Sequence, residues 1–208
     1  MKIKICGICR PEDARYAAQS GADYLGVILA KRGPRAQSID QAEIILAEAG
    51  DAQRVGVFAD QTIQEMAEAC ERLNLDVIQL HGHESSAVVA EVQRSLSCLV
   101  WKAASLESTD DLERAVDTYA DVVNGMLFDG PRAGSGAAFE WDLAFDARAL
   151  LPPNVQFIIA GGLTPENVGA AVAHLQPDIV DVASGVEENV CEKSKERIER
   201  FIRNHKGR

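Results

Sequence analysis

The chain alternates between short apolar runs and longer segments with a helical pattern of apolar and polar positions. Eight runs rich in β-branched and other apolar residues stand at 2–8, 24–29, 54–59, 77–82, 99–104, 123–130, 156–162 and 179–186. Between them, apolar residues recur at three- and four-residue steps, as Ile63, Met66, Cys70 and Leu73 do. Several of these segments begin on Ser, Thr or Asp, which favour helix N-caps. The pattern predicts eight strand–helix units.

Strands that are apolar nearly throughout are typical of a parallel sheet whose faces are covered by helices. Eight units close into a (β/α)8 barrel, and 208 residues is near the short end of that fold's length range. We therefore predict an α/β protein with one (β/α)8 TIM barrel, a single domain over residues 1–208. The alternative is an open doubly wound sheet, but its G-x-G-x-x-G fingerprint is missing after the first run.

Charge and cysteine content narrow the functional classes. The net charge of −11 argues against a general nucleic-acid binder or a membrane-surface protein, although backbone amides of an acidic protein still bind phosphate. The first ten residues do not resemble a signal peptide, and no apolar run has the length of a membrane span, so we expect a cytoplasmic protein. Five scattered cysteines suit reduced intracellular thiols better than a disulfide framework.

In a (β/α)8 barrel the active site lies at the C-terminal ends of the strands. The predicted strand exits carry chemically active side chains, namely Cys6, Lys31, Arg32, Arg35, Asp60, Gln79, His81, His83 and Asp129. Of the two histidines, His81 is expected to line the barrel mouth and His83 to be solvated. A thiol, carboxylates and basic groups are thus predicted to converge on one rim.

Glycine turns follow the seventh and eighth runs, at 160–164 and 183–187. This is the usual phosphate site of the fold. We expect Thr164-Pro165 to begin a helix whose free amides point at an anion, with 133–136 as a third contributor. The alternative is that these glycines only make tight turns between strands and helices.

Cys6 and Cys9 form a C-x-x-C pair at a strand-to-helix junction, which leaves a redox or zinc site as an alternative. No second C-x-x-C or histidine cluster completes a zinc site, and His81 and His83 should point to opposite faces of a strand. We therefore predict no metal site. Cys6 by itself could also be a small buried core residue.

Taken together, these motifs resemble the phosphoribosylanthranilate isomerases, the Amadori-rearrangement enzymes of tryptophan synthesis. The resemblance rests on KICGI (4–8), PEDA (11–14), QLHG (79–82), LFDG (127–130), GSG with FEW (134–141), AGGLTPENV (160–168) and VDVASGVE (180–187). The chain departs from the family pattern at Cys9, at Cys191 and in the loop LAKRGPR (29–35). In this interpretation the C-x-x-C pair is a local coincidence.

The resemblance implies a site and a reaction. It makes Cys6 the general base, Asp129 the general acid and Arg35 the partner of the anthranilate carboxylate. It assigns the phosphate site to Gly162, Leu163, Ser184 and Gly185, with Gly136 nearby. We also expect His81 and Asp181 to contact the substrate. It implies a phosphorylated sugar substrate, no cofactor, and a monomer or homodimer.

Thiol and carboxylate fit the chemistry. An acid must protonate the furanose ring oxygen, and a base must remove the proton on C2 from the other side of the sugar. Free thiols titrate near ~8.5 and aspartates near ~3.9, so the site must lower the first pKa or raise the second. Lys4 lies two residues before Cys6 and about one layer away, so it is not expected to be an obvious local partner of the thiol, although it can still supply positive potential.

Three other functions stay open at this point. The first is a related barrel isomerase acting on another phosphoribosyl aminoaldose, although that chemistry uses an aspartate where Cys6 stands. The second is a non-catalytic phosphosugar-binding barrel. The last is a redox or metal protein that uses Cys6 and Cys9.

Overall fold

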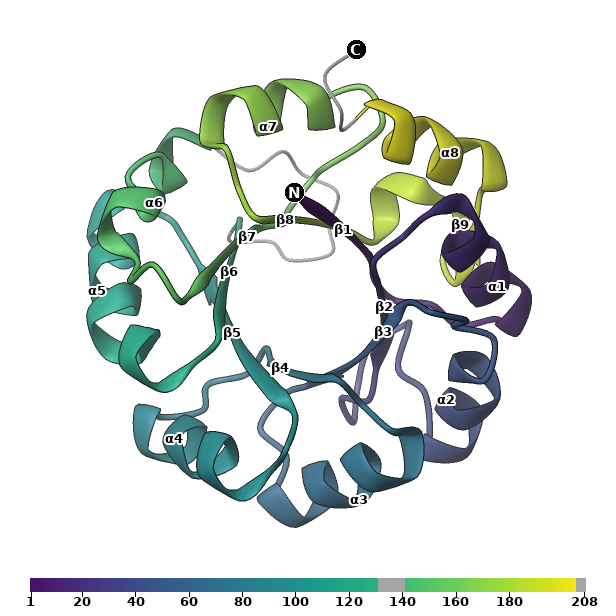
Figure 1. Ribbon diagram of the computed structural model, residues 1–208, viewed down its shortest axis with the longest axis horizontal. Helices are drawn as coiled ribbons and strands as arrows, with labels where there is room; N and C mark the ends of the chain where they lie inside the picture. Colours follow the sequence, from purple (N-terminus) through teal and green to yellow (C-terminus); the bar gives the residue numbers. More distant parts are fainter. Residues whose placement is uncertain (131–140, 205–208) are drawn as a thin grey trace.

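The computed structural model describes residues 1–130 and 141–204, which form a closed barrel of parallel strands (Figure 1). The strands are β1 (Lys2–Ile5), β2 (Tyr24–Ile28), β3 (Gln53–Phe58), β4 (Val77–Leu80), β5 (Leu99–Ser105), β6 (Gly125–Asp129), β7 (Gln156–Ile159) and β8 (Ile179–Val182). Each strand pairs with the next along the chain, and β8 closes the barrel against β1, where Lys4 is in register with Asp181. The eight-stranded parallel barrel predicted from the apolar pattern is confirmed.

The helices lie on the outside of this barrel (Figure 1). They are α1 (Pro11–Ser20), α2 (Ile39–Leu46), α3 (Ile63–Leu73), α4 (Ser86–Ser95), α5 (Thr109–Tyr119), α6 (Ala147–Leu150), α7 (Val168–Leu175) and α8 (Lys195–Asn204), with 3₁₀ turns η1 (Ala120–Val122), η2 (Trp141–Ala144) and η3 (Ser184–Val186). Local sequence explains their ends. Thr62 and Glu65 form a capping box on α3, and Gly21 takes a left-handed conformation after α1.

Two buried cores follow from the alternation of side chains along the strands. On β6, Met126 and Phe128 point outward into the layer between sheet and helices, while Leu127 points into the barrel. Asp129 is two positions beyond Leu127 and therefore faces the barrel interior as well. The same alternation on β1 turns Cys6 inward, and the strand ends thus deliver polar groups to the barrel mouth.

The C-terminal third departs from the predicted elements in two places. Helix α7 begins at Val168 and not at Thr164-Pro165, because the Asn167 side chain accepts from the Thr164 N–H and donates to the Gly162 carbonyl, which holds a turn there. After β8 the chain forms η3 and a short hairpin of β9 (Glu187–Asn189) and β10 (Glu192–Lys193), which the apolar pattern did not predict.

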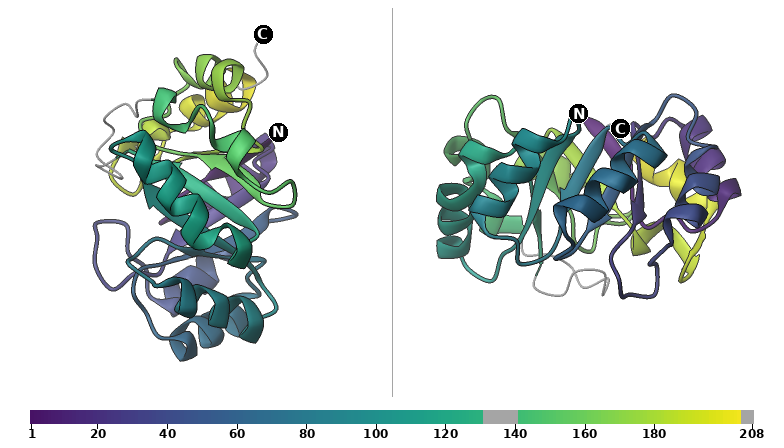
Figure 2. Two further views of the ribbon diagram at one scale, coloured as in Figure 1. Left: turned by 90° about the vertical axis from the view of Figure 1, so that its left-hand side faces the viewer. Right: turned by 90° about the horizontal axis from the view of Figure 1, so that it is seen from below.

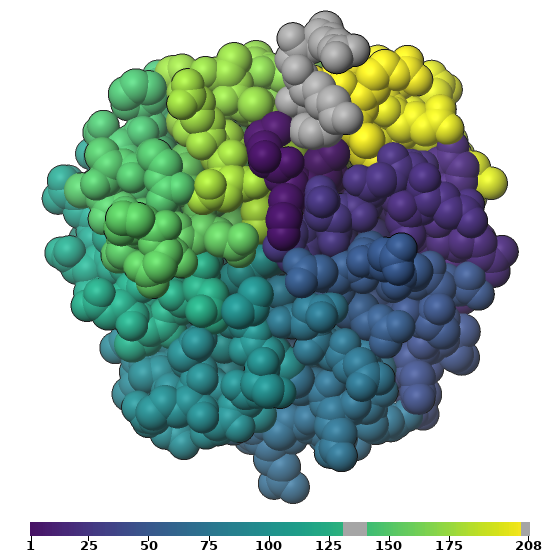
Figure 3. All heavy atoms as spheres, viewed as in Figure 1, coloured from purple at the N-terminus to yellow at the C-terminus, as the bar shows by residue number. Residues whose placement is uncertain are grey.

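The two ends of the barrel differ. In the right-hand view of Figure 2 the N-terminus lies at the upper edge, and the yellow-green hairpin β9–β10 lies at the lower edge with the loops that follow the strands. Side chains fill the middle of the face on which the chain begins (Figure 3), so the barrel is a packed core and not a pore. Within the described ranges, every helix is too short or too polar to cross a membrane.

Candidate active site

A cavity of about 320 Å³ opens at the C-terminal ends of the strands. Its walls come from seven of the eight strand ends and the loops that follow them, and its polar lining residues are Cys6, Arg32, Arg35, Gln79, His81, Asp129, Asp181 and Ser184. Its volume lies within the range of small-molecule sites. The predicted thiol, carboxylate and basic groups do converge on one rim, but Lys31 and Asp60 are not among the described residues that line the cavity. Lys31 instead pairs with Glu65 at 2.7 Å, and Asp60 Oδ1 accepts from the His83 N–H at 2.6 Å.

Cys6 lies at the end of β1 beside a buried ion pair. The Lys4 ammonium lies 3.0 Å from both carboxylate oxygens of Asp181 and interacts electrostatically with the Cys6 thiol. Gly26 on β2 leaves room for this cluster, since a Cβ there would lie 2.9 Å from the Cys6 sulfur. The expectation that Lys4 is no local partner of the thiol is therefore wrong, because its long side chain spans the distance to the next layer.

The electrostatics of this cluster set the resting state of the thiol. Burial raises the pKa of Cys6 above the ordinary thiol value, although the Lys4 ammonium opposes the shift. Burial also opposes the charge on Lys4, but Asp181 and Cys6 outweigh it and raise the Lys4 pKa. At neutral pH Cys6 is thus a neutral thiol, next to a fixed cation that can stabilise the thiolate once it forms.

Asp129, at the end of β6, is a carboxyl that must be protonated if it is to act as an acid, and its surroundings favour the protonated form. Its carboxyl is only 6% exposed, and burial raises its pKa to about 6, with the charge of Asp181 adding to the shift. The Gly130 N–H, 2.7 Å from the Asp129 Oδ1, opposes the shift. A useful fraction of Asp129 is protonated near neutral pH, as a general acid requires.

Strand β4 contributes a neutral polar pair. The Gln79 amide nitrogen donates to His81 Nδ1 at 3.0 Å, which assigns the imidazole proton to Nε2. Burial lowers the pKa of His81, and the Lys4 ammonium lowers it further, so the ring is neutral and directs a donor at the cavity. As expected, His81 lines the mouth and His83 is exposed.

The turns after β7 and β8 form a cradle of backbone amides. Within the ranges that the structure describes, the N–H groups of Gly162, Leu163, Ser184 and Gly185 have no acceptor. All four residues line the mouth cavity, and they also line an outer cavity of about 480 Å³ that includes Arg197. A Cβ on Gly185 would lie 1.9 Å from the Leu163 carbonyl oxygen, so only glycine permits this approach. Free amides in two facing turns are a typical anion site.

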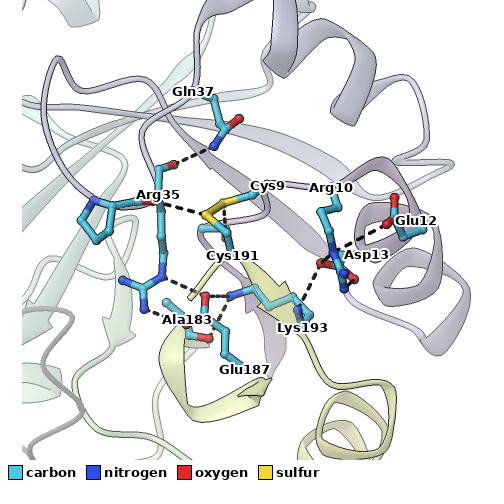
Figure 4. The surroundings of a disulfide bond; sticks show 12 residues. Cys9, Arg10, Glu12, Asp13, Arg35, Gln37, Ala183, Glu187, Cys191 and Lys193 are labelled. Atoms are coloured by element: carbon cyan, nitrogen blue, oxygen red, sulfur yellow. Dashed lines mark hydrogen bonds and ion pairs between the residues drawn. A yellow bond between two sulfur atoms is a disulfide. The ribbon is translucent and has the colours of Figure 1, made fainter. Parts of the chain in front are cut away.

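Arg35 reaches the cavity from the loop after β2, and Figure 4 shows its surroundings. Its Nε and Nη2 donate to the two oxygens of Glu187 at 2.8 and 2.6 Å. Lys193 lies on the other side of that carboxylate, with its Nζ 3.0 Å from Glu187 Oε1. Burial alone would raise the pKa of Glu187, but the two cations outweigh it and hold the pKa below its ordinary value.

The cysteines contradict the expectation of reduced thiols. Cys9 is bonded to Cys191, and Cys70 is bonded to Cys98, which leaves Cys6 as the one free cysteine. Both bonds join segments that are distant in sequence, so their spacing in the chain carried no signal. Cys6 and Cys9 therefore do not form a C-x-x-C redox pair. In the described part of the chain, no group of three or more histidine, cysteine or acidic side chains gathers around a metal-sized site.

Comparison with known proteins identifies the family to which this barrel belongs. The family model described as N-(5'-phosphoribosyl)anthranilate isomerase matches residues 3–204. A curated isomerase of this name from Pseudomonas putida is 39% identical over 209 residues, which cover 98% of this chain and 96% of the relative. The chain belongs to the phosphoribosylanthranilate isomerase family.

Solved structures of the family share the whole fold. Monomers of the dimeric phosphoribosylanthranilate isomerase from Thermotoga maritima superpose with a TM-score of 0.88 at 33% identity, covering 100% of this chain and 99% of that one. A phosphoribosylanthranilate isomerase in complex with reduced 1-(o-carboxyphenylamino)-1-deoxyribulose 5-phosphate superposes with a TM-score of 0.87 at 32% identity, with the same coverage. The resemblance drawn from the sequence motifs is confirmed.

Nine of the ten predicted site residues line the mouth cavity, and the tenth, Gly136, lies outside the described part of the chain. Those that line the mouth cavity are Cys6, Arg35, His81, Asp129, Gly162, Leu163, Asp181, Ser184 and Gly185. Sequence reasoning did not assign a role to Glu187 or Lys193, and it gave Lys4 only a positive potential and no direct contact with the thiol. The spacing K-x-C held a signal for Lys4, because both residues must face the barrel interior.

Proposed function

We infer that this chain catalyses the Amadori rearrangement of N-(5-phospho-β-D-ribosyl)anthranilate to 1-(2-carboxyphenylamino)-1-deoxy-D-ribulose 5-phosphate, a step of tryptophan biosynthesis. Family membership over nearly the whole chain supports the activity. The observation that carries it is the pairing, across one cavity, of a thiol beside a buried ammonium with a carboxyl whose pKa is raised to about 6.

In this proposal Asp129 acts first. Its carboxyl donates a proton to the furanose ring oxygen, the bond between that oxygen and C1 breaks, and the anthranilate nitrogen lone pair forms the C1=N bond of a Schiff base. The protonated fraction of Asp129 at neutral pH follows from its burial. The developing positive charge on nitrogen forms beside an Asp129 carboxylate that has just lost its proton, which compensates part of that charge.

Cys6 acts second. Its thiol first loses its proton to solvent. The thiolate then takes the proton from C2, and the electrons of that bond form the C1=C2 double bond of an enolamine while the iminium nitrogen becomes neutral. Tautomerisation with proton return to C1 gives the ketone. The Lys4 ammonium stabilises the thiolate, and Asp181 holds Lys4 in place. A neutral His81 beside the cavity can donate a hydrogen bond to the sugar hydroxyls without competing for the proton.

The two ends of the substrate are bound by different parts of the mouth. We assign the phosphate to the free amides of Gly162, Leu163, Ser184 and Gly185. Two observations support this assignment: these N–H groups have no acceptor within the described residues, and they lie after β7 and β8, where this fold usually binds phosphate. We assign the anthranilate carboxylate to Arg35, which lines the same cavity. A substrate spanning both sites lies with its sugar between Cys6 and Asp129.

The proposal also covers the partners, the location and the domain organisation of the protein. We expect a small-molecule substrate only, since a net charge of −11 disfavours nucleic acid. We propose a cytoplasmic enzyme with the whole chain, 1–208, as one domain. A monomer and a homodimer are both compatible with the barrel described here.

The direct test is turnover of freshly made phosphoribosylanthranilate, followed as the loss of its fluorescence. The parent should consume it without added metal or cofactor, and Cys6→Ser and Asp129→Asn should each lower kcat by roughly 10²–10⁴-fold. The histidine-pathway aminoaldose should be turned over far more slowly. No turnover by the parent would leave the non-catalytic phosphosugar-binding barrel as the better description.

A further inference from the structure

The cavity holds an arginine whose orientation is set by residues outside the cavity. Arg35 uses one edge of its guanidinium, the Nε and Nη2 edge, to bind both oxygens of Glu187. Within the described residues, Nη1 has no acceptor. Because a guanidinium presents five donors in a rigid plane, the other edge keeps the geometry that matches a second carboxylate.

Glu187 is in turn held from behind. Lys193 Nζ donates to Glu187 Oε1 at 3.0 Å and to the Ala183 carbonyl at 2.9 Å, and both side chains of the pair are at most 5% exposed. Glu187 is not among the described residues that line the mouth cavity. One anion between two cations leaves a net positive charge on the side of Arg35 that faces the cavity.

The arginine also has little freedom to move away. Its side chain is 10% exposed and lies against Gly7, where a Cβ would come within 2.7 Å of the Arg35 Cδ. Glu187 and Lys193 stand in the two strands of the hairpin β9–β10, and the Cys9–Cys191 bond ties the turn of that hairpin to the loop after β1 (Figure 4). The Cys191 sulfur lies 3.3 Å from the Pro34 carbonyl oxygen, next to Arg35 itself.

We propose that Glu187, backed by Lys193, is a positioning residue that turns the free edge of Arg35 toward the ring carboxylate of the substrate and so sets specificity for an anthranilate. The inference rests on the proposed function, because it assumes a substrate with a carboxylate at that end. Glu187 acts only through Arg35 and touches neither the sugar nor the phosphate. Neutralising Glu187 leaves the arginine charged and its aliphatic stem packed against Gly7, but the ion pair no longer fixes the orientation of the guanidinium plane.

The test compares Glu187→Gln with the parent, with Arg35→Ala and with the double variant. Glu188→Gln, at the exposed neighbouring position, is the matched control. Glu187→Gln should raise KM for phosphoribosylanthranilate and Ki for free anthranilate by roughly five- to tenfold, while kcat stays within about twofold. The Ki for inorganic phosphate should equal that of the parent, because the phosphate end is untouched.

The double variant separates positioning from a general structural role. If Glu187 works through Arg35, adding Glu187→Gln to Arg35→Ala should not raise KM further, whereas independent effects would multiply. Should Glu187→Gln fail to fold with two unpaired cations, Glu187→Gln combined with Lys193→Met removes the second cation. This variant is compared with Lys193→Met alone, because Lys193 also donates to the Ala183 carbonyl. Parental KM and anthranilate Ki in Glu187→Gln, or multiplying effects in the double variant, would overturn the inference. A parent without any turnover would instead overturn the proposed function.

Discussion

Replacing Asp129 by asparagine should stabilise the fold while it lowers kcat by roughly 10²–10⁴-fold. The folded-state pKa of Asp129 is about 6, against an ordinary value of 3.8, and the side chain is 6% exposed. Keeping the ionised carboxylate in the folded protein therefore reduces stability by about 3 kcal/mol, at about 1.4 kcal/mol for each pKa unit. Asparagine has the same shape, carries no charge and can keep the 2.7 Å contact between Oδ1 and the Gly130 N–H.

The stability difference between Asp129→Asn and the parent should depend on pH. Because the pKa is higher in the folded state, the unfavourable term is absent below about pH 4, grows between about pH 4 and 6, and is complete above pH 6. Asp129→Asn should thus melt about 5–10 °C above the parent at pH 7.5 and at the parent's temperature near pH 4. Thermal unfolding followed by circular dichroism measures both. Asp117→Asn, on the exposed side of α5, is the control and should change neither.

The same variant tests the division of roles between acid and base. In the parent, the protonated fraction of Asp129 falls above pH 6 as the thiolate fraction of Cys6 rises, so kcat/KM should be level from about pH 6 to 8. Without the acid only the thiolate term is left, and the residual kcat/KM should climb about tenfold per pH unit over that range. Ionisation of the substrate affects both proteins equally, so it cancels in the ratio of the two kcat/KM values at each pH. A variant with parental kcat, or with parental melting at pH 7.5, would refute the reasoning.

Three shorter predictions address other parts of the site. Cys6→Ser should lose roughly 10²–10⁴-fold in kcat while its melting temperature stays near that of the parent, measured by the fluorescence assay and circular dichroism. Gly185→Ala should raise both KM and the phosphate Ki at least about tenfold, because the new methyl group collides with the Leu163 carbonyl and displaces the turn. An unchanged phosphate Ki would remove that turn from the phosphate site. Thiol titration of the unfolded, unreduced protein should give one thiol per chain, against five after reduction. Five thiols before reduction would show that the two disulfides do not form.

Local sequence determined the barrel and the place of its chemistry. The apolar runs and the helical spacing are properties of neighbouring residues, and eight such units have one common way to close. Alternation with a period of two then turned Cys6 and Asp129 inward, and parallel strands brought their C-terminal ends to one rim. This is why the thiol, the carboxyl and the glycine turns could be placed at one rim from the sequence, whereas the roles of Cys6 and Asp129 came from the resemblance to a known family.

Only the tertiary structure decided which charged side chains of the site pair with one another. Lys4 meets Asp181 because β8 closes against β1 in a register that pairs these positions, 177 residues apart. Arg35 meets Glu187 across 152 residues because the loop after β2 and the hairpin after β8 lie at the same mouth. Such pairs depend on how a closed sheet is staggered, and burial then sets their pKa values. Neither the register nor the burial is written in the spacing of residues along one segment, because both are properties of the assembled barrel.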